Sequence, residues 1–194
     1  MSYTLQSVLA ILLLAAFSPL LLLIWLVYLV FYGGRAIFRM TRIGRNEKRF
    51  VLYKFRTMKD DVPIVLSPEE EEEWRKFGKL RDDMRLLPGV GHFMRRFSLD
   101  ELPQLWNVVR GDMALVGPRP IIDAENVIYG RFAKRIHSVK PGITGLWQVS
   151  GRNLLTYRRR IAINLYYVRH RSLKLDLWIL YRTVWAVVGG RGAF

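Results

Sequence analysis

The sequence predicts a mostly α-helical, membrane-associated protein with one small β-hairpin. A long uncharged and apolar run, Val8 to Tyr32, has the length of a membrane helix. Two short strand-like runs flank a turn-forming stretch at Gly44 to Glu47, and helical periodicity dominates the second half of the chain. With 194 residues, 51% of them hydrophobic, the chain can form a core. We therefore expect a membrane segment at residues 1–34 and a catalytic domain at residues 35–194.

The charge balance predicts an anionic partner. Lys and Arg number 31 against 16 Asp and Glu, a net charge of +15. Nucleic acid, anionic lipid and phosphorylated metabolites all fit that charge, but the membrane segment favours anionic membrane lipid and phosphorylated substrates over nucleic acid. The absence of cysteine excludes disulfides, thiolate metal sites and Cys nucleophiles. The scattered histidines His92, His137 and His170 do not predict a zinc site.

Ser18 and Pro19 interrupt the apolar run near its middle. The residues alone favour a single kinked helix that spans the membrane, because most such runs span. The alternative is a re-entrant hairpin, in which Pro19 frees a backbone carbonyl, Ser18 helps to satisfy it, and both ends emerge on one face. The basic residues that follow place the downstream chain in the cytoplasm: Arg35, Arg39, Arg42, Arg45, Lys48 and Arg49.

The hairpin is expected from Ala36–Arg42 and Phe50–Phe55. It ends in Lys54 and Arg56, which share one face of the strand. These two cations are either substrate contacts or ordinary solvated charges, and the pattern does not decide between the two. Further on, Ser67-Pro68 opens an acidic helix to which we assign no chemistry.

The central stretch, Arg95 to Pro120, carries two adjacent carboxylates, Asp100 and Glu101. Pro103 is tolerated only in the first turn of a helix, so a helix is expected to begin at Asp100 or Glu101, where its dipole favours an anion. The alternative is purely structural, because a serine three residues before Glu101 fits a capping box. The predicted apolar face comprises Leu102, Leu105, Trp106 and Val109, with Gly111 as the stop.

Arg119 lies in a Pro-Arg-Pro turn after a short buried strand at Ala114–Val116. Two prolines hold that arginine rigidly, and a merely solvating arginine has no need of such a frame. Ile121–His137 is expected to form one amphipathic helix.

The last third of the chain begins with a turn-rich loop, Lys140 to Gln148, with Trp147 as an exposed aromatic, followed by Gly151-Arg152. Leu154–Arg171 has a basic and an apolar face and is expected to lie in the headgroup layer. Leu173–Val188 is too short and too charged to predict a span.

The order of these motifs resembles the monotopic phosphoglycosyl transferases, in their small catalytic-core form. These bacterial sugar transferases move a sugar 1-phosphate from a UDP-sugar to a polyprenyl phosphate. The resemblance covers nearly the whole chain and rests on Ser18-Pro19, KFRTM at 54–58, SLDELPQL at 98–105, GDM at 111–113, VGPRP at 116–120, KPGITG at 140–145 and QVSGR at 148–152.

The resemblance implies that Asp100 is the nucleophile and that Glu101 is its partner, close to a magnesium ion. Arg119 would grip the phosphate, and the further substrate contacts would be Lys54, Arg56, Arg95, Gln148, Arg152 and Asp176. Ser18-Pro19 would form the re-entrant break, which reverses the preference for a span. The chain departs from the family pattern at Phe97, a place usually small and hydroxylated, and in the loop Asp83–Gly91.

The expected function is therefore transfer of a sugar 1-phosphate from a UDP-sugar to polyprenyl (undecaprenyl) phosphate at the cytoplasmic face of the bacterial inner membrane, with release of UMP. An oxygen-rich site favours Mg²⁺, or Mn²⁺, over zinc. The alternatives are a membrane-tethered polyanion-binding protein and a membrane phosphohydrolase. The sequence leaves open the donor sugar, the prenyl length, the pathway and whether the chain forms a homodimer.

Overall fold

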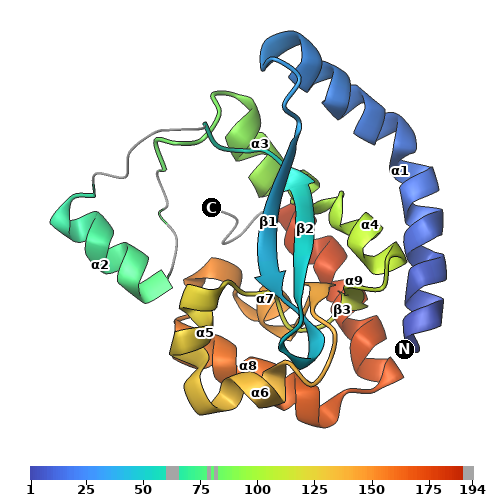
Figure 1. The fold of residues 1–194 in the computed structure, drawn as a ribbon, viewed down its shortest axis with the longest axis vertical. Coiled ribbons are helices and arrows are strands. Elements are labelled where there is room, and N and C mark those ends of the chain that lie inside the picture. The colour runs from blue at the N-terminus through green and yellow to red at the C-terminus, as the bar shows by residue number, and fades with distance from the viewer. Residues whose placement is uncertain (60–65, 78–79, 81–82, 190–194) are drawn as a thin grey trace.

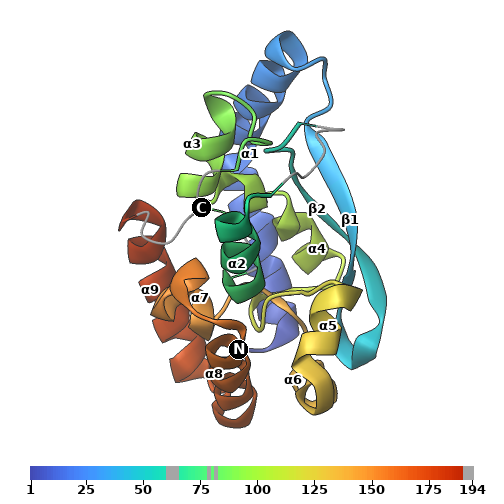
Figure 2. The same cartoon turned by 90° about the vertical axis from the view of Figure 1, so that its left-hand side faces the viewer.

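The computed structural model describes residues 1–59, 66–77, 80 and 83–189. A long apolar helix, α1 (Tyr3–Phe31), runs along one side of a mostly helical body and bends on its way (Figure 1). In Figure 2 the two-stranded hairpin runs along one side of that body, and the C-terminal helices α8 and α9 lie on the other side. The expectation of a mostly helical chain with a small antiparallel hairpin is confirmed.

The regular elements after α1 are β1 (Ile37–Ile43), β2 (Arg49–Phe55), α2 (Pro68–Phe77), α3 (Val90–Arg96), α4 (Gln104–Val109), β3 (Ala114–Val116), α5 (Asp123–Tyr129), α6 (Ala133–Ile136), β4 (Gly142–Thr144), α7 (Leu146–Ser150), α8 (Tyr157–His170) and α9 (Leu173–Gly189). Short 3₁₀ turns occur at Arg45–Glu47, Leu99–Glu101, Gly130–Phe132 and Arg152–Leu154. Gly130 has a positive φ of 49°, which breaks the single helix expected at Ile121–His137 into α5 and α6.

Pro19 lies inside α1, and its missing N–H leaves the carbonyl of Ala15 without its helical bond. The Ser18 hydroxyl donates to that same carbonyl at 2.8 Å. The role expected for Ser18, satisfying a backbone group freed by Pro19, is confirmed. Both residues are exposed, as is most of the middle of the helix, and α1 is the one helix in the described chain long and apolar enough to cross a membrane.

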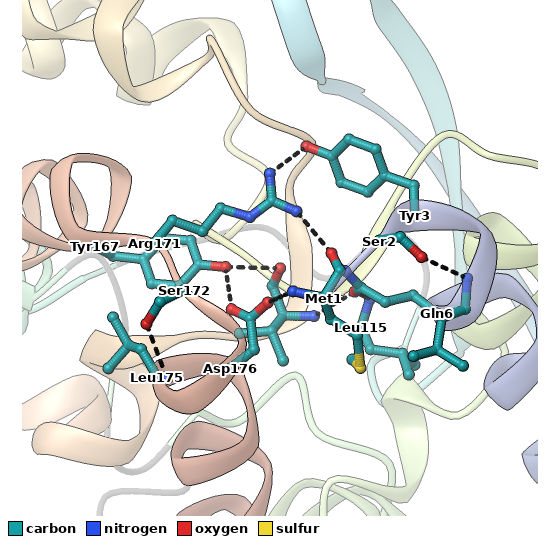
Figure 3. Close-up of polar contacts among 12 residues, drawn as sticks. Met1, Ser2, Tyr3, Gln6, Leu115, Tyr167, Arg171, Ser172, Leu175 and Asp176 are labelled. Carbon is teal, nitrogen blue, oxygen red and sulfur yellow. Dashed lines mark hydrogen bonds and ion pairs between the residues drawn. The ribbon is translucent and has the colours of Figure 1, made fainter.

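The N-terminal part of α1 is fixed to the core of the body. The Gln6 side chain is fully buried, and its Oε1 accepts the backbone amides of Leu115 at 2.7 Å and Val116 at 3.2 Å. The Met1 ammonium pairs with the buried Asp176 carboxylate at 2.7 Å, and that carboxylate also accepts the Tyr167 hydroxyl at 2.8 Å (Figure 3).

The other end of α1 is fixed to the same body at a different place. The Tyr28 hydroxyl donates to the carbonyl of Arg56, and the Tyr32 hydroxyl donates to the carbonyl of Pro88 at 2.9 Å. Tyr28 is fully buried and its ring stacks on that of Phe55. Both ends of α1 therefore contact one folded body, while the stretch from Ala15 to Pro19 is exposed.

The hairpin is confirmed with a register that pairs Ile37 with Phe55 and Ile43 with Arg49. A second, parallel pair joins β3 to β4, which brings the VGPRP and KPGITG motifs together. At this crossing the backbone of Gly117 lies so close to the backbones of Lys140 and Gly142 that a side chain at Gly117 would collide with both. Only glycine allows this approach.

Helix α8 carries the basic face expected for Leu154–Arg171, and its apolar side packs into the core. On α8, Arg158, Arg159 and Arg169 are exposed, while Ile161 is buried. On α9 the large side chains Trp178, Tyr181 and Trp185 are exposed. The apolar side of α8 is therefore used in the protein core, whereas α9 leaves large aromatic side chains exposed.

Candidate active site

Asp100 and Glu101 lie in a 3₁₀ turn, Leu99–Glu101, that precedes helix α4. The expectation that an α-helix begins at Asp100 or Glu101 is wrong, because α4 begins at Gln104. The capping-box alternative is not formed either: Ser98 adopts a left-handed backbone, φ 53°, and its side chain makes no cap bond. Bonds from Glu101 N to Ser98 O and from Leu102 N to Leu99 O instead close tight turns up to Pro103, which has no amide to donate.

Helix α4 also presents a slightly different face from the predicted one. Leu105 and Val108 are buried, whereas Trp106 is half exposed. The predicted stop at Gly111 is confirmed, since α4 ends at Val109 and Gly111 takes a positive φ of 84°. The tight turns thus hold the two carboxylates in a short segment that the buried side of α4 anchors to the core.

Asp100 is buried, at 8% exposure, and its charge acts on Lys54 of β2, Arg95 of α3 and Arg119. Burial lowers the pKa of Lys54 on β2, and the negative charge of Asp100 opposes that shift. Burial likewise lowers the pKa of Arg95 on α3, again against the pull of Asp100. Arg95 is further held by a hydrogen bond from its Nε to the Thr57 hydroxyl at 3.2 Å. The structure therefore brings the predicted Lys54 and Arg95 to the predicted carboxylate.

Arg119 contacts the second carboxylate, with 3.3 Å between its Nη1 and Glu101 Oε1. Burial alone would lower the pKa of Arg119, but the carboxylates of Glu101, Glu125 and Asp100 outweigh it and the pKa is raised. The turn that carries Arg119 is fixed by backbone bonds from Gly117 N to Thr144 O and from Gly142 N to Pro118 O, both 2.9 Å. The rigid frame inferred from the Pro-Arg-Pro turn thus includes the β3–β4 pair.

A second ion pair lies near Arg119 and was not predicted from the sequence. Arg42 on β1 meets Glu125 on α5 at 3.2 Å, and both side chains are largely buried. Burial, and after it the positive charge of Arg119, lower the pKa of Arg42 to about 10. Glu125 lies in the first turn of α5, where acidic residues are common, so no sequence pattern distinguishes it from an ordinary helix start.

Arg152 also reaches this cluster. It donates from Nη2 to the Ser98 hydroxyl at 3.4 Å, and its Nη1 is buried without a hydrogen-bond partner. Burial lowers the pKa of Arg152, and Glu101 opposes the shift. Gln148 lies close by in sequence but is used structurally, donating to the carbonyl of Ile143 at 3.0 Å, while its Oε1 is buried without a partner.

Two expected placements differ in the structure. Trp147 was predicted to be exposed but is buried at 3% exposure, because it forms part of helix α7 and packs under the Arg160 guanidinium, 4.8 Å from the ring centre. Asp176 was expected in the polar cluster with Lys54, but it is fully buried against Met1 and Tyr167 (Figure 3).

Arg56, expected to contact the substrate, follows the last residue of β2. Its side chain donates to the carbonyl of Tyr32 at 3.2 Å. It belongs to the contact between the hairpin and the end of α1.

The cluster as a whole is suited to an anionic phosphorylated ligand. Four cations, Lys54, Arg95, Arg119 and Arg152, surround two carboxylates, which leaves a net charge of +2. Fixed cations at such a site stabilise charge on phosphoryl oxygens. Together with the apolar helix α1, this charge suits a protein that handles a phosphorylated ligand beside a membrane.

The comparison with known proteins names the class more closely. The chain belongs to the bacterial sugar transferase family, whose profile matches residues 1–190, and it is a phosphoglycosyl transferase.

Three relatives illustrate the match. The exopolysaccharide production protein ExoY of Sinorhizobium fredii (strain NBRC 101917 / NGR234) is 44% identical over 95% of this chain and 84% of the relative. The undecaprenyl-phosphate galactose phosphotransferase of Salmonella typhimurium is 43% identical over 98% of this chain, and the match spans 41% of that longer protein. The UDP-glucose:undecaprenyl-phosphate glucose-1-phosphate transferase of Xanthomonas campestris pv. campestris is 35% identical over 97% of this chain and 39% of its own length.

Proposed function

We propose that this chain transfers a sugar 1-phosphate from a UDP-sugar to undecaprenyl phosphate or another polyprenyl phosphate and releases UMP. The printed names of the Salmonella and Xanthomonas relatives support the acceptor and the type of reaction. The names of the ExoY proteins support a role in producing surface polysaccharide. One observation carries the proposal: the adjacent carboxylates Asp100 and Glu101 lie among fixed cations that suit a diphosphate.

In this proposal Asp100 is the nucleophile. One of its carboxylate oxygens forms a bond to the sugar-linked phosphorus of the donor, the bond from that phosphorus to the bridging oxygen breaks, and UMP leaves with the electron pair. A phosphate oxygen of the acceptor lipid then attacks the same phosphorus. The Asp100 carboxylate leaves unchanged, and the product is a polyprenyl diphosphate sugar.

The cations around Asp100 address the main obstacle, which is repulsion between a carboxylate and a diphosphate. Lys54 and Arg95 lie on the Asp100 side, and Arg119 bonds Glu101, so positive charge is already in place when the donor enters. Preorganised charge of this kind needs no rearrangement during the reaction. Arg152, with its buried unpartnered nitrogen, is suited to a further phosphate oxygen.

The donor set fits a magnesium ion, with manganese as a substitute. Within the described residues, no group of three or more His, Cys, Asp or Glu side chains is assembled for a metal. Mg²⁺ is commonly bound by one or two carboxylates together with substrate phosphates, so Glu101, with Asp100, would hold it once the donor is present. When bound, the ion supplies charge neutralisation at the phosphoryl oxygens.

We infer further that α1 enters and leaves the same membrane leaflet. Its two ends contact one folded body, through Gln6 on one side and Tyr28 on the other, whereas a spanning helix would place its ends on opposite sides of a hydrocarbon core of about 30 Å. The basic residues after α1 support a catalytic domain on the cytoplasmic face of the inner membrane.

The test is release of UMP from a panel of UDP-sugars, with and without polyprenyl phosphate. We expect release of UMP in catalytic amounts only with the lipid, and radiolabel from the sugar on the denatured chain when the lipid is omitted. Asp100→Asn should abolish both turnover and labelling, because an amide cannot form the acyl phosphate. Asp123→Asn is the matched control, since Asp123 is an exposed partner of the exposed Arg49.

The same assay separates the alternatives. A phosphohydrolase would release UMP and free sugar phosphate without lipid, and a polyanion-binding protein would release no UMP from any donor. Near-normal turnover by the Asp100→Asn variant would overturn the covalent mechanism and favour direct transfer between the two substrates.

A further inference from the structure

A carboxylate outside the Asp100–Glu101 pair lies near the turn that carries Arg119. Glu125 is in the first turn of α5, and its side chain is only 20% exposed. The mechanism proposed above does not use this residue. Because an unpaired charge is costly to bury, a largely buried carboxylate needs partners. The partners of Glu125 indicate what it holds in place.

Glu125 fixes the chain that directly follows the Arg119 turn. Its Oε2 accepts the backbone amide of Ile122 at 3.2 Å, three residues after Arg119. The preceding residue, Ile121, is held by β1, because its carbonyl accepts the amide of Ile43 at 2.9 Å. The β3–β4 pair already holds the residues before Arg119, so the turn is secured from both sides.

Two further side chains hold the Glu125 carboxylate itself. Its Oε2 also accepts Nη1 of Arg42 at 3.2 Å, and its Oε1 accepts the Tyr157 hydroxyl of α8 at 3.4 Å. Groups from β1, α5 and α8 therefore fix the position of one negative charge. That charge is in place before any ligand enters.

The charges alternate in sign from β1 to the candidate active site. Arg42 pairs with Glu125, and Arg119 pairs with Glu101 at 3.3 Å. The two ion pairs also interact with each other. Burial would lower the pKa of Arg119, but the negative charges of Glu101 and Glu125 outweigh it and the pKa is raised. Arg119 therefore responds to a carboxylate on each of two different elements.

We propose that Glu125 is a positioning residue for Arg119, which it serves by fixing the backbone after the turn and by holding the guanidinium in place while Glu101 interacts with the donor. The inference rests on the proposed function, in which Glu101 also holds the ion that comes with the donor. A carboxylate with that second task is not a constant partner for Arg119. Glu125 has no other task, so its charge remains available throughout.

The variant Glu125→Gln tests the charge with little change of shape. The glutamine oxygen can accept from Arg42 and the Ile122 amide, and the glutamine NH₂ can donate to the Tyr157 oxygen. We expect kcat/KM for the UDP-sugar to fall about tenfold, because a displaced guanidinium stabilises the transition state less well. Tyr157→Phe is the matched control, since it removes a hydrogen bond to Glu125 but leaves the charge, and it should change kcat/KM by less than about threefold. An unchanged kcat/KM in Glu125→Gln, or an equal loss in Tyr157→Phe, would overturn the proposal.

A double-mutant cycle shows whether Glu125 acts through Arg119. In the Arg119→Lys background, Glu125→Gln should cost less than about a further threefold in kcat/KM, because no guanidinium remains to be positioned. Losses that multiply in the double variant would overturn the proposal, since they would show two independent effects. If Glu125→Gln does not fold, Arg42→Gln/Glu125→Gln replaces it, because this variant leaves neither charge buried without its partner. It should show the same loss of about tenfold, and an unchanged kcat/KM would again overturn the proposal.

Chemical modification gives a readout that needs no turnover. The Arg119 side chain is 29% exposed, so phenylglyoxal can reach it, and mass spectrometry of peptides distinguishes it from other arginines. Phenylglyoxal reacts with the neutral guanidine, which a nearby negative charge disfavours, so Arg119 should react about threefold faster or more in Glu125→Gln. Asp123→Asn, an exposed change in the first turn of the same helix, is the control and should leave the rate unchanged. An equal Arg119 rate in Glu125→Gln and the original chain would overturn the proposal.

The two proposals can fail separately. If no UDP-sugar yields UMP but Arg119 reacts faster in Glu125→Gln, the reaction is wrong and the positioning role stands. If UMP release is normal in the original chain and Glu125→Gln changes neither kcat/KM nor the reactivity of Arg119, the reaction stands and the positioning role is wrong.

Discussion

Replacing Gln6 by methionine tests how strongly the first turns of α1 are joined to the strand before the Arg119 turn. Gln6 Oε1 accepts two buried backbone amides, from Leu115 and Val116, and the Gln6 side chain is fully buried. Methionine keeps the approximate volume but provides no comparable acceptor, so both amides lose their partner.

An unsatisfied buried donor costs about 1–3 kcal/mol, so two cost about 2–6 kcal/mol. For a chain of this size each kcal/mol lowers Tm by about 2–4 °C, which predicts a fall of roughly 4–24 °C. The assay is thermal unfolding in one detergent, followed by tryptophan fluorescence. Thr4→Val, at an exposed position two residues away, is the control and should shift Tm by less than about 2 °C. If the Tm of the Gln6→Met variant lies within about 2 °C of the Tm of the original chain, the two amide hydrogen bonds do not contribute the stability calculated here.

The remaining predictions concern the site and the membrane helix. Arg119→Lys should lower kcat/KM for the donor by about 10² or more with little change in Tm, because a flexible ammonium replaces a planar guanidinium that is fixed beside Glu101; a loss of less than about threefold in steady-state kinetics would argue against a role for that guanidinium. Burial lowers the pKa of Lys54, so a required Lys54 cation is lost below the usual pH of lysine deprotonation. Activity should then fall as pH rises through that lowered pKa, and Lys54→Arg should move the alkaline limb of the pH–rate profile to higher pH; an unmoved limb would exclude Lys54 as its source. Pro19→Ala restores the missing helical bond and should shift α1 toward spanning. The readout is labelling of a Ser2→Cys probe from outside sealed right-side-out vesicles, with Glu71→Cys as the protected internal position. External labelling of Ser2→Cys without the Pro19 change would refute the re-entrant arrangement. Treatment with EDTA should abolish turnover and added Mg²⁺ or Mn²⁺ should restore it, whereas full activity in EDTA would rule out the metal.

The parts of the site that the sequence predicted depend on local patterns. Alternation along β2 put Lys54 on one face without assigning it a role, and the two prolines around Arg119 predicted a rigid turn. The resemblance to the sugar transferases supplied the expected roles of Lys54 and Arg95. The interruption of α1 was also predicted from a local pattern, the Ser18-Pro19 pair. Pro19 has no amide to donate to the Ala15 carbonyl, and the Ser18 hydroxyl donates to it instead.

Two of the errors, at Asp176 and Trp147, depended on contacts between distant segments. Asp176 is buried by its partners Met1 and Tyr167, one of which lies at the far end of the sequence. Trp147 was assigned to the surface because its neighbours are turn residues, but Arg160 on α8 covers its ring. The helix expected at Asp100 failed for a local reason, a left-handed Ser98 that starts a tighter turn, and such a conformation at a serine is too uncommon to predict.

The close approach of Gly117 to Gly142 has a consequence for how this enzyme can be altered by mutation. Two backbones in direct contact leave no side chain to vary, so the support of the Arg119 turn cannot be adjusted in small steps. In a saturation library, Gly117 and Gly142 should therefore reject even alanine, while the exposed faces of α8 and α9 accept many residues. Variants with a changed donor preference would then carry substitutions at side chains around Asp100 and Glu101. Gly117 and Gly142 would be unchanged in all of them.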